Sequence, residues 1–498
     1  MSEKWYQFYL DKIKESDGGL IIVIDHDNIS TFEDITEPLK TAYLLHQYRS
    51  EFSLRSFLNK NIGERIIVFK TSEFGYLPYD IEATAMIVVW QLKDIFTKLD
   101  ITSLKNYQLN QYQSIYEGYR NIEKSLNEVF EQETNNLIND WLKTTHQSTE
   151  LTELKDLAGE IRCLLNEQSI DWIGTACIWG RVSYLNDLIE DNDMVELKEI
   201  DNMIALRFQE HILSNYHDLF YESYVSTPVT IDKVMHHIGT QPGDKKVIIC
   251  FDGMGFQEWH CLKKYLSDKG IDKFNENAVY ALLPTLTKIS RRALFSGLRR
   301  IETLTTTTED NGFRTHVNTN WQNGNNKAKK VILSAPVTWS SDYLEYDYLG
   351  IIINLIDDIA HSTVLIAESK RAMQNSFTTI LKETEIDKIL SEFLLHGYRI
   401  YILSDHGSVW CRGNGLHAEK YIVEERAKRA LVYPNKILAE EFCRGKDLLL
   451  YNNQHVSGNN VLVFPKFREM FARANDLVIT HGGIHIEEVI VPFIEVIR

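Results

Sequence analysis

The sequence predicts an α/β protein with a buried parallel sheet, and two observations lead to that prediction. In the second half of the chain, apolar runs such as residues 247–251 and 398–403 have the length and continuity of strands that are covered on both faces. Between about residues 106 and 235, glycine and proline are sparse and apolar residues recur at helical spacing. Buried strands and amphipathic helices together are typical of α/β folds.

Along the chain, the pattern predicts three regions. Residues 1–105 are expected to form a small α/β domain, with strands at 20–24 and 65–69 and helical periodicity over 81–96. Residues 106–240 are expected to be mostly helical. Turn-forming residues near 226–228 and 239–244 then precede the first strong strand, so we place the third domain at 241–498.

Composition limits the class of function. The 498 residues are 44% hydrophobic and carry a net charge of -17, which disfavours a general role in coating nucleic acid. The six cysteines are scattered and form no CxxC pair, as in proteins of a reducing compartment. Neither a signal-peptide pattern nor an apolar stretch of about 18 residues is present. We therefore expect a cytoplasmic protein with no membrane association.

Residue types that bind metals follow four of the apolar runs. Ligands collect at the carboxyl ends of strands in open α/β sheets, so we expect these residues to converge on one edge of one sheet. Carboxylates and imidazoles together could hold two divalent ions. The residues are Asp252, Asp357 with His361, Asp405 with His406, and His481.

Most of these residues also have a plain structural interpretation. Asp252 precedes a glycine, and Asp-Gly after a strand is common in ordinary turns. Asp357 and His361 lie at i and i+4, which places both on one helical face, although Asp357 could equally cap a helix. Few purely structural roles would explain why Asp405 and His406 stand side by side after a buried strand. That pair therefore points most directly to a metal.

A possible nucleophile lies in the segment 284–292. A threonine hydroxyl attacks poorly until a metal or a base lowers its effective pKa, and a metal can do so without a histidine base. Thr287 is the candidate. Lys288, Arg291 and Arg292 follow it and could neutralise phosphate oxygens, although a basic helix start explains each of them equally well.

Taken in order, these residues resemble the two-metal site of the alkaline phosphatase superfamily of phosphatases, phosphodiesterases and sulfatases. Residues 284–287, followed by Ser296 and Gly297, resemble the nucleophile segment of its nucleotide phosphodiesterases, where the second threonine attacks; this favours Thr287 over Thr285. The segments FDGMG, LPTLTKISRRALFSG, SDHG and THGGIHIEEVIVP are similar to the PglZ family. Its members include a component of BREX phage-defence systems and the output domain of some bacterial response regulators.

The resemblance implies an alkaline-phosphatase-like sheet, flanked by helices on both faces, in a catalytic domain over 241–498. It also implies two divalent ions, with zinc favoured and manganese as the alternative. One ion would activate Thr287 and the other would stabilise the leaving oxygen. The implied ligand sets are Asp252, Asp405 and His406 for the first ion, and Asp357, His361 and His481 for the second.

Three positions leave alternatives open. His485 follows His481 where PglZ relatives usually have a small polar residue, so either histidine could complete the second set. Ser290 stands where related phosphodiesterases often use an asparagine to contact a phosphate oxygen. His417 could line the pocket or donate to phosphate, or it could be a plain surface histidine.

The implied activity is that of a phosphodiesterase acting on a nucleotide, a cyclic oligonucleotide or nucleic acid, in phage defence or nucleotide signalling. The alternative is a scaffold that binds a defence partner such as a DNA methyltransferase, with little or no turnover. A pure scaffold has no physical need for a nucleophile and six metal ligands. The sequence therefore favours catalysis.

Overall fold

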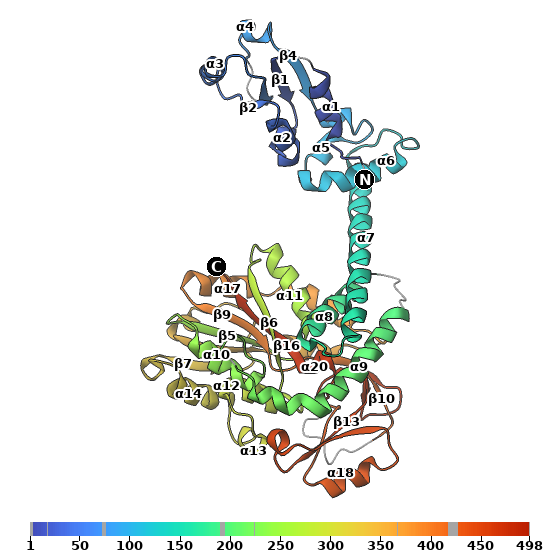
Figure 1. The fold of residues 1–498 in the computed structure, drawn as a ribbon, viewed down its shortest axis with the longest axis vertical. Helices are drawn as coiled ribbons and strands as arrows, with labels where there is room; N and C mark the ends of the chain where they lie inside the picture. Colours follow the sequence, from blue (N-terminus) through green and yellow to red (C-terminus); the bar gives the residue numbers. More distant parts are fainter. Residues whose placement is uncertain are drawn as a thin grey trace. The chain divides into compact units, whose positions relative to one another are not determined.

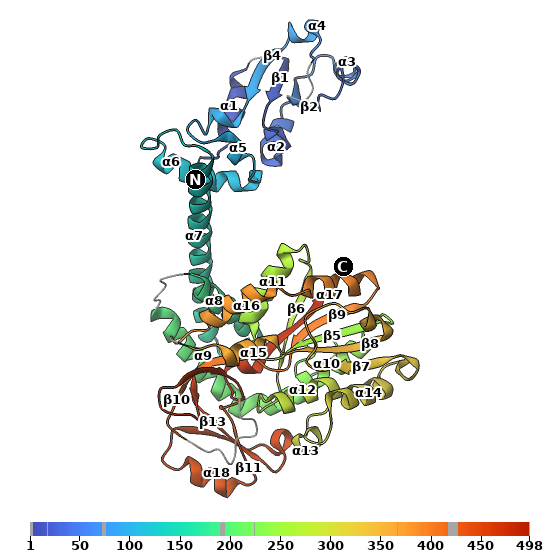
Figure 2. The ribbon, with the colours of Figure 1, turned by 180° about the vertical axis from the view of Figure 1, so that it is seen from behind.

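The computed structural model describes residues 3–497 except 17, 72–75, 190–194, 224, 366 and 417–426. The chain divides into two compact units, residues 1–149 and 150–498. Figures 1 and 2 show the ribbon from opposite sides. Each unit is built around its own buried apolar core. The division into three regions at 105 and 240 stays a prediction.

The first unit contains a parallel sheet of four strands in the order β2-β3-β1-β4. The strands predicted near 20–24 and 65–69 are present. The strands are β1 (Leu20–Asp25), β2 (Leu44–Gln47), β3 (Ile66–Thr71) and β4 (Met86–Trp90). The helices are α1 (Gln7–Glu15), α2 (Glu33–Lys40), α3 (Glu51–Lys60), α4 (Tyr79–Glu82), α5 (Ile101–Leu104) and α6 (Tyr112–Ile122).

The helical periodicity over 81–96 was a wrong prediction. Residues 86–90 form β4, which pairs with β1 at one edge of the sheet. Its β-branched residues suit a strand, and Ile87 and Val89 stay partly exposed, because within the described residues the other elements cover that face incompletely. The buried residues Ile81, Val88, Leu92 and Phe96 recur at spacings of 7, 4 and 4, and so imitated one stripe of an amphipathic helix.

Long helices open the second unit, as the spacing between 106 and 235 predicted. They are α7 (Glu131–Leu165), which spans the division at residue 149, α8 (Trp172–Leu188) and α9 (Val195–Asn215), and the short α10 (Val234–Thr240) follows them. Asp171 caps α8, because its side chain accepts a hydrogen bond from the backbone N–H of Gly174.

The main sheet of the second unit has six strands in the order β6-β16-β9-β5-β8-β7. β7, β8, β5 and β9 are parallel, whereas β16 runs antiparallel between β9 and β6. Every residue of β5 and β8 is buried, which explains their unbroken apolar runs. The strands are β5 (Lys246–Phe251), β6 (Phe274–Tyr280), β7 (Lys329–Ile332), β8 (Tyr348–Ile353), β9 (Arg399–Ser404) and β16 (Ile490–Val496).

Helices cover both faces of this sheet (Figure 1), which confirms the predicted fold class. On one face α8, α11 and α16 pack together, and on the other α12 packs against α10 and α14. The helices are α11 (Phe256–Asp268), α12 (Thr287–Ser296), α13 (Ile301–Leu304), α14 (Glu309–Asn320), α15 (Leu355–Ser362), α16 (Arg371–Leu381), α17 (Ile386–Leu395), α18 (Lys436–Cys443), α19 (Gln454–Ser457) and α20 (Ile486–Val489).

Two small sheets lie outside the main one, in the orders β14-β10-β15 and β11-β13-β12. The expectation that all four metal motifs follow strands of one sheet was wrong for His481, because β15 belongs to the first of these small sheets. β10 begins just after His406 and pairs with β15, with Val409 opposite Thr480. This pairing places His481, which follows β15, beside His406 at the edge of the main sheet. The strands are β10 (Val409–Gly413), β11 (Leu431–Tyr433), β12 (Leu448–Tyr451), β13 (Val461–Pro465), β14 (Glu469–Met470) and β15 (Leu477–Thr480).

Candidate active site

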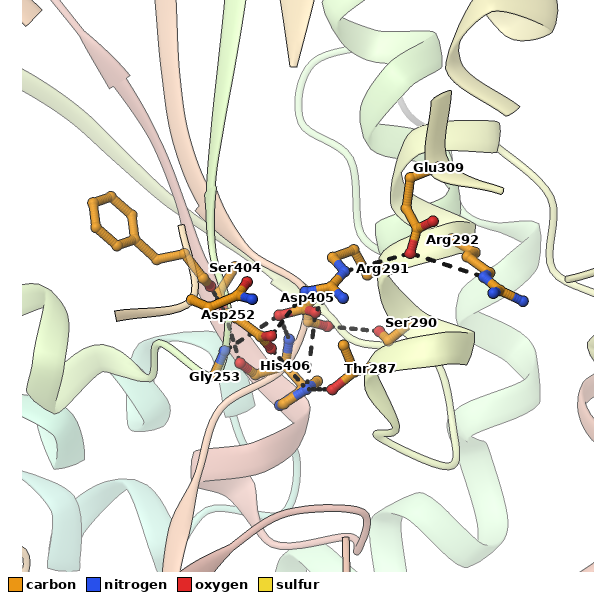
Figure 3. A network of polar contacts seen from close by, with 12 residues as sticks. Asp252, Gly253, Thr287, Ser290, Arg291, Arg292, Glu309, Ser404, Asp405 and His406 are labelled. Carbon is orange, nitrogen blue, oxygen red and sulfur yellow. Dashed lines mark hydrogen bonds and ion pairs between the residues drawn. The ribbon is translucent and has the colours of Figure 1, made fainter. Parts of the chain in front are cut away.

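Asp252, Asp405 and His406 form a buried group, the first cluster, at the carboxyl ends of β5 and β9. The two strands pair in register with Phe251 opposite Ser404, so the residues that follow them lie side by side. His406 Nε2 is 3.5 Å from Asp252 Oδ1 and 3.8 Å from Asp405 Oδ2 (Figure 3). Three possible ligand atoms therefore face a common point.

Each carboxylate of the first cluster has one oxygen held by the protein and one left over. Asp405 Oδ1 accepts hydrogen bonds from the backbone N–H groups of Gly253 and His406, and Asp252 Oδ2 accepts one from Arg291. Asp252 Oδ1 and Asp405 Oδ2 are buried and have no hydrogen-bond partner among the described residues. Buried oxygens without a partner are costly, and a divalent cation between them would remove that cost. The first cluster thus fits a metal ion.

The proximity of the two carboxylates also affects their protonation. Burial, and then the charge of Asp252, raise the pKa of Asp405 well above its ordinary value. Arg291 and backbone N–H groups act in the opposite direction but do not cancel the rise. Two buried carboxylates this close are unfavourable together unless a cation joins them.

Asp357, His361 and His481 form the second cluster, with their possible ligand atoms within 4.8 Å of one another. Asp357 and His361 lie one turn apart on α15, as their spacing predicted, and Asp357 Oδ1 is 3.0 Å from His361 Nε2. Burial alone would raise the pKa of Asp357, but the close contact with His361 and then the nearby His481 and His406 lower it to about 2. The rings of His406 and His481 stack with centroids 4.0 Å apart, so the two clusters are adjacent.

Backbone carbonyl groups fix the orientation of two imidazole rings. Nδ1 of His406 lies 3.1 Å from the carbonyl oxygen of Gly407, and Nδ1 of His481 lies 2.9 Å from that of Thr285. A ring nitrogen can bond a carbonyl only as an N–H donor, which leaves the lone pair on Nε2. In both rings Nε2 therefore carries the lone pair that binding of a metal ion requires.

The two threonines of the nucleophile segment have different surroundings. Thr287 begins α12, and its Oγ1 lies 3.0 Å from His406 Nε2 (Figure 3). Thr285 is fully buried, donates to the carbonyl of Gly483 and accepts from the N–H of Gly482. Thr285 therefore holds the loop that carries His481, whereas Thr287 faces the first cluster.

The predicted phosphate contacts also differ in their surroundings. Arg291 lies one turn after Thr287 on α12, and its Nη1 donates to Asp252 Oδ2 at 2.8 Å. Ser290 is fully buried; its hydroxyl donates to the carbonyl of Asp405 and accepts from a backbone N–H. Lys288 is exposed. His417 lies outside the described residues.

His485, the alternative to His481, lies in a different group. Its possible ligand atom is within 4.8 Å of those of Asp201 and Glu487. Arg468 already pairs with both acids, through two bonds of 2.7 Å to Asp201 and bonds of 2.5 and 3.4 Å to Glu487. Asp201, Arg468 and Glu487 thus form a buried ion cluster, which joins α9 to the segment 468–487. Sequence reasoning missed this cluster, although two glutamates within the apolar segment 484–491 were a signal.

A cleft of about 860 Å³ lies beside this ion cluster and not at the metal clusters. Its wall includes residues of α8, α9 and α16, but no described member of the first or second cluster. Its acids and bases are mostly paired with one another, so the cleft shows no clear preference for a ligand.

The sequence was also compared with known proteins. Residues 231–496 match the family described as the BREX system PglZ alkaline phosphatase-like domain. The chain belongs to the PglZ family. The match contains all members of both clusters and Thr287. Helices α8 and α9, the second of which carries Asp201, precede it. No curated protein matches the chain. Among the described residues, none of the helices of this PglZ protein is both long and apolar enough to cross a bilayer.

The PglZ protein is also similar to solved structures of ectonucleotide pyrophosphatase/phosphodiesterase 5. The murine structure is 14% identical with a TM-score of 0.35, and covers 50% of this chain and 87% of its own. An inactive variant of the murine protein in complex with AMP gives 12% identity and a TM-score of 0.36, with 51% and 88% covered. The human protein gives 11% and 0.32, with 50% and 87% covered.

Proposed function

We propose that this PglZ protein is a two-metal phosphodiesterase in which Thr287 attacks phosphorus. The observation that carries the proposal is the position of the Thr287 hydroxyl, 3.0 Å from His406 Nε2 of the first cluster. A hydroxyl beside a metal-ligand set can be activated without a separate base. Family membership supports the same class of reaction, because the matched domain is alkaline phosphatase-like.

Two divalent ions are proposed, one in each cluster. The mixture of carboxylate and imidazole ligands favours zinc, with manganese as the alternative. His481 is proposed to complete the second set, because the acids beside His485 are already paired with Arg468. When bound, the ions would lower the pKa of the attacking hydroxyl and stabilise negative charge on the phosphate oxygens.

The proposed reaction has two steps. Thr287 Oγ1 forms a bond to phosphorus while the bond from phosphorus to the leaving alcohol breaks, and the hydroxyl proton ends on that alcohol. Water then cleaves the phosphothreonine, which restores the Thr287 hydroxyl and releases a phosphomonoester. Lys288 is proposed to neutralise a phosphate oxygen during both steps. Ser290 is proposed to act indirectly, because its hydroxyl holds the backbone of Asp405.

The proposed substrate is a phosphodiester of a nucleotide, a cyclic oligonucleotide or nucleic acid, cleaved in the cytoplasm during bacterial phage defence. The net charge of -17 favours the smaller substrates over long nucleic acid. All six cysteines are free, as expected in a reducing compartment. A defence partner such as a DNA methyltransferase is compatible with this proposal and would bind elsewhere on the surface.

Hydrolysis of bis-p-nitrophenyl phosphate with zinc or manganese tests the proposal. Thr287→Ala and Asp405→Ala should each lower kcat/KM at least about 100-fold, because they remove the attacking group and a metal ligand. Thr306→Ala is the matched control, since Thr306 is an exposed threonine outside both clusters. Equal rates in wild type and Thr287→Ala, or no turnover by any variant with metal bound, would refute the enzyme and favour a scaffold.

A further inference from the structure

A third carboxylate, Glu309, lies behind the first cluster. It is the first residue of α14, and although charged it is only 8% exposed. Its Oε1 lies 3.6 Å from Arg291 Nε and 3.8 Å from Arg292 Nε (Figure 3). A glutamate is seldom buried unless it is paired, and these two arginines are the cations that pair with it here.

Arg291 is shared between Glu309 and the two carboxylates of the first cluster. Nη1 donates to Asp252 Oδ2 at 2.8 Å, and Nε lies 3.9 Å from Asp405 Oδ2. The same Nε is buried without a hydrogen-bond partner in the described part of the chain, at nearly equal distance from Asp405 and Glu309. The guanidinium group therefore lies between two acids, and its position depends on the charges of both.

This sharing matters because Arg291 and a divalent ion compete for the same negative charge. Asp405 Oδ2 is one of the oxygens proposed to bind the ion, and Nε of Arg291, whose guanidinium group is permanently charged, lies 3.9 Å from it. A cation closer to that oxygen would weaken metal binding, and a cation held away from it would strengthen metal binding. Glu309 lies on the far side of Arg291 and attracts it away.

We propose that Glu309 is a positioning residue that raises the affinity of the first cluster for its divalent ion by holding the Nε side of Arg291 away from Asp405. The inference rests on the proposed function in so far as Asp252 and Asp405 are metal ligands. Glu309 lies outside both clusters, so it would influence metal binding without being a metal ligand. Interactions of this outer kind typically change metal affinity about 10- to 100-fold.

Calorimetric titration of the metal-free protein with zinc or manganese tests the inference without reference to turnover. Glu309→Gln should weaken one of two binding events about tenfold and leave the other unchanged. Glu309→Asp keeps the carboxylate and should stay near wild type. Glu302→Gln, on the neighbouring α13 and exposed, is the matched control.

A double-variant cycle distinguishes an effect through Arg291 from a direct effect of the Glu309 charge. In an Arg291→Gln background, Glu309→Gln should no longer change the affinity. A tenfold loss that persists in that background would overturn the inference. So would wild-type affinity in Glu309→Gln, a result that leaves the proposed function intact. Absence of any ion binding by the wild type would overturn both.

Discussion

Gly407→Ala is the sharpest test of how the protein holds His406. A Cβ atom at position 407 would lie 1.8 Å from the carbonyl oxygen of Glu487, whereas real Cβ atoms essentially never come within 3.0 Å of an atom outside their own and the two adjoining residues. The two backbone segments must therefore separate by about 1.2 Å. The segments are also joined by a hydrogen bond from Gly407 N–H to the carbonyl of Glu488. Such overpacking costs about 1–3 kcal/mol.

The displacement should reach the metal site directly, because the carbonyl of Gly407 orients the His406 ring. Metal ligands tolerate errors of about 0.2 Å, and a misplacement of about 1 Å can lower a rate about 100-fold. We expect Gly407→Ala to bind one ion at least about tenfold more weakly and to lower kcat/KM about 100-fold. Gly159→Ala in α7 is the matched control, because a Cβ atom at position 159 would meet none of the described atoms within 4 Å. Wild-type affinity in Gly407→Ala by calorimetry would refute this account of His406.

Three further predictions concern the buried ion cluster and the metals. Arg468→Met leaves the carboxylates of Asp201 and Glu487 buried without their guanidinium partner. The free energy of unfolding, measured in urea, should therefore fall by about 3–5 kcal/mol, and a fall of less than about 1 kcal/mol would contradict this prediction. Burial alone would raise the pKa of Glu487, but Arg468 lowers it from 4.5 to about 2. The stability that this carboxylate contributes should therefore be complete above pH 4.5 and be lost as the pH falls towards 2. The difference in unfolding free energy between wild type and Glu487→Gln should shrink over that interval, and a constant difference would speak against the ion pair. An ion at about 100 times its Kd should stabilise the fold by about 2.7 kcal/mol, so chelation should lower Tm and added zinc should restore it; an unchanged Tm would count against resident metals.

The sequence predicted the structure best where a short run of neighbouring residues determines where a side chain lies. The apolar runs before Asp252 and Asp405 are neighbouring parallel strands of one sheet, and Asp357 and His361 lie on one helix, α15, as their spacing predicted. Such features depend on neighbours in the chain. Their assignment as metal ligands remains a prediction that the titrations above would test.

Other parts of the site depend on contacts that no local pattern contains. The position of His481 beside the first cluster depends on the pairing of β15 with β10. The proposed choice of His481 over His485 depends on the position of Asp201, which is distant in sequence. Arg291 was expected to contact phosphate, but its donor faces Asp252. Glu309 gave no signal, because a single glutamate at a helix start is usually a favourable charge near the helix dipole.

The buried pairing of Arg468 with Asp201 bears on which part of the chain must fold as one piece. Asp201 precedes residue 231, where the match to the PglZ family begins, while Arg468 and Glu487 lie inside it. A fragment that starts at 231 would lose Asp201 and the Trp179 indole that donates to Glu487. The segment that matches the family is therefore shorter than the segment whose buried charges pair with one another. Loss of Asp201 is expected to be tolerated only where Arg468 is replaced as well.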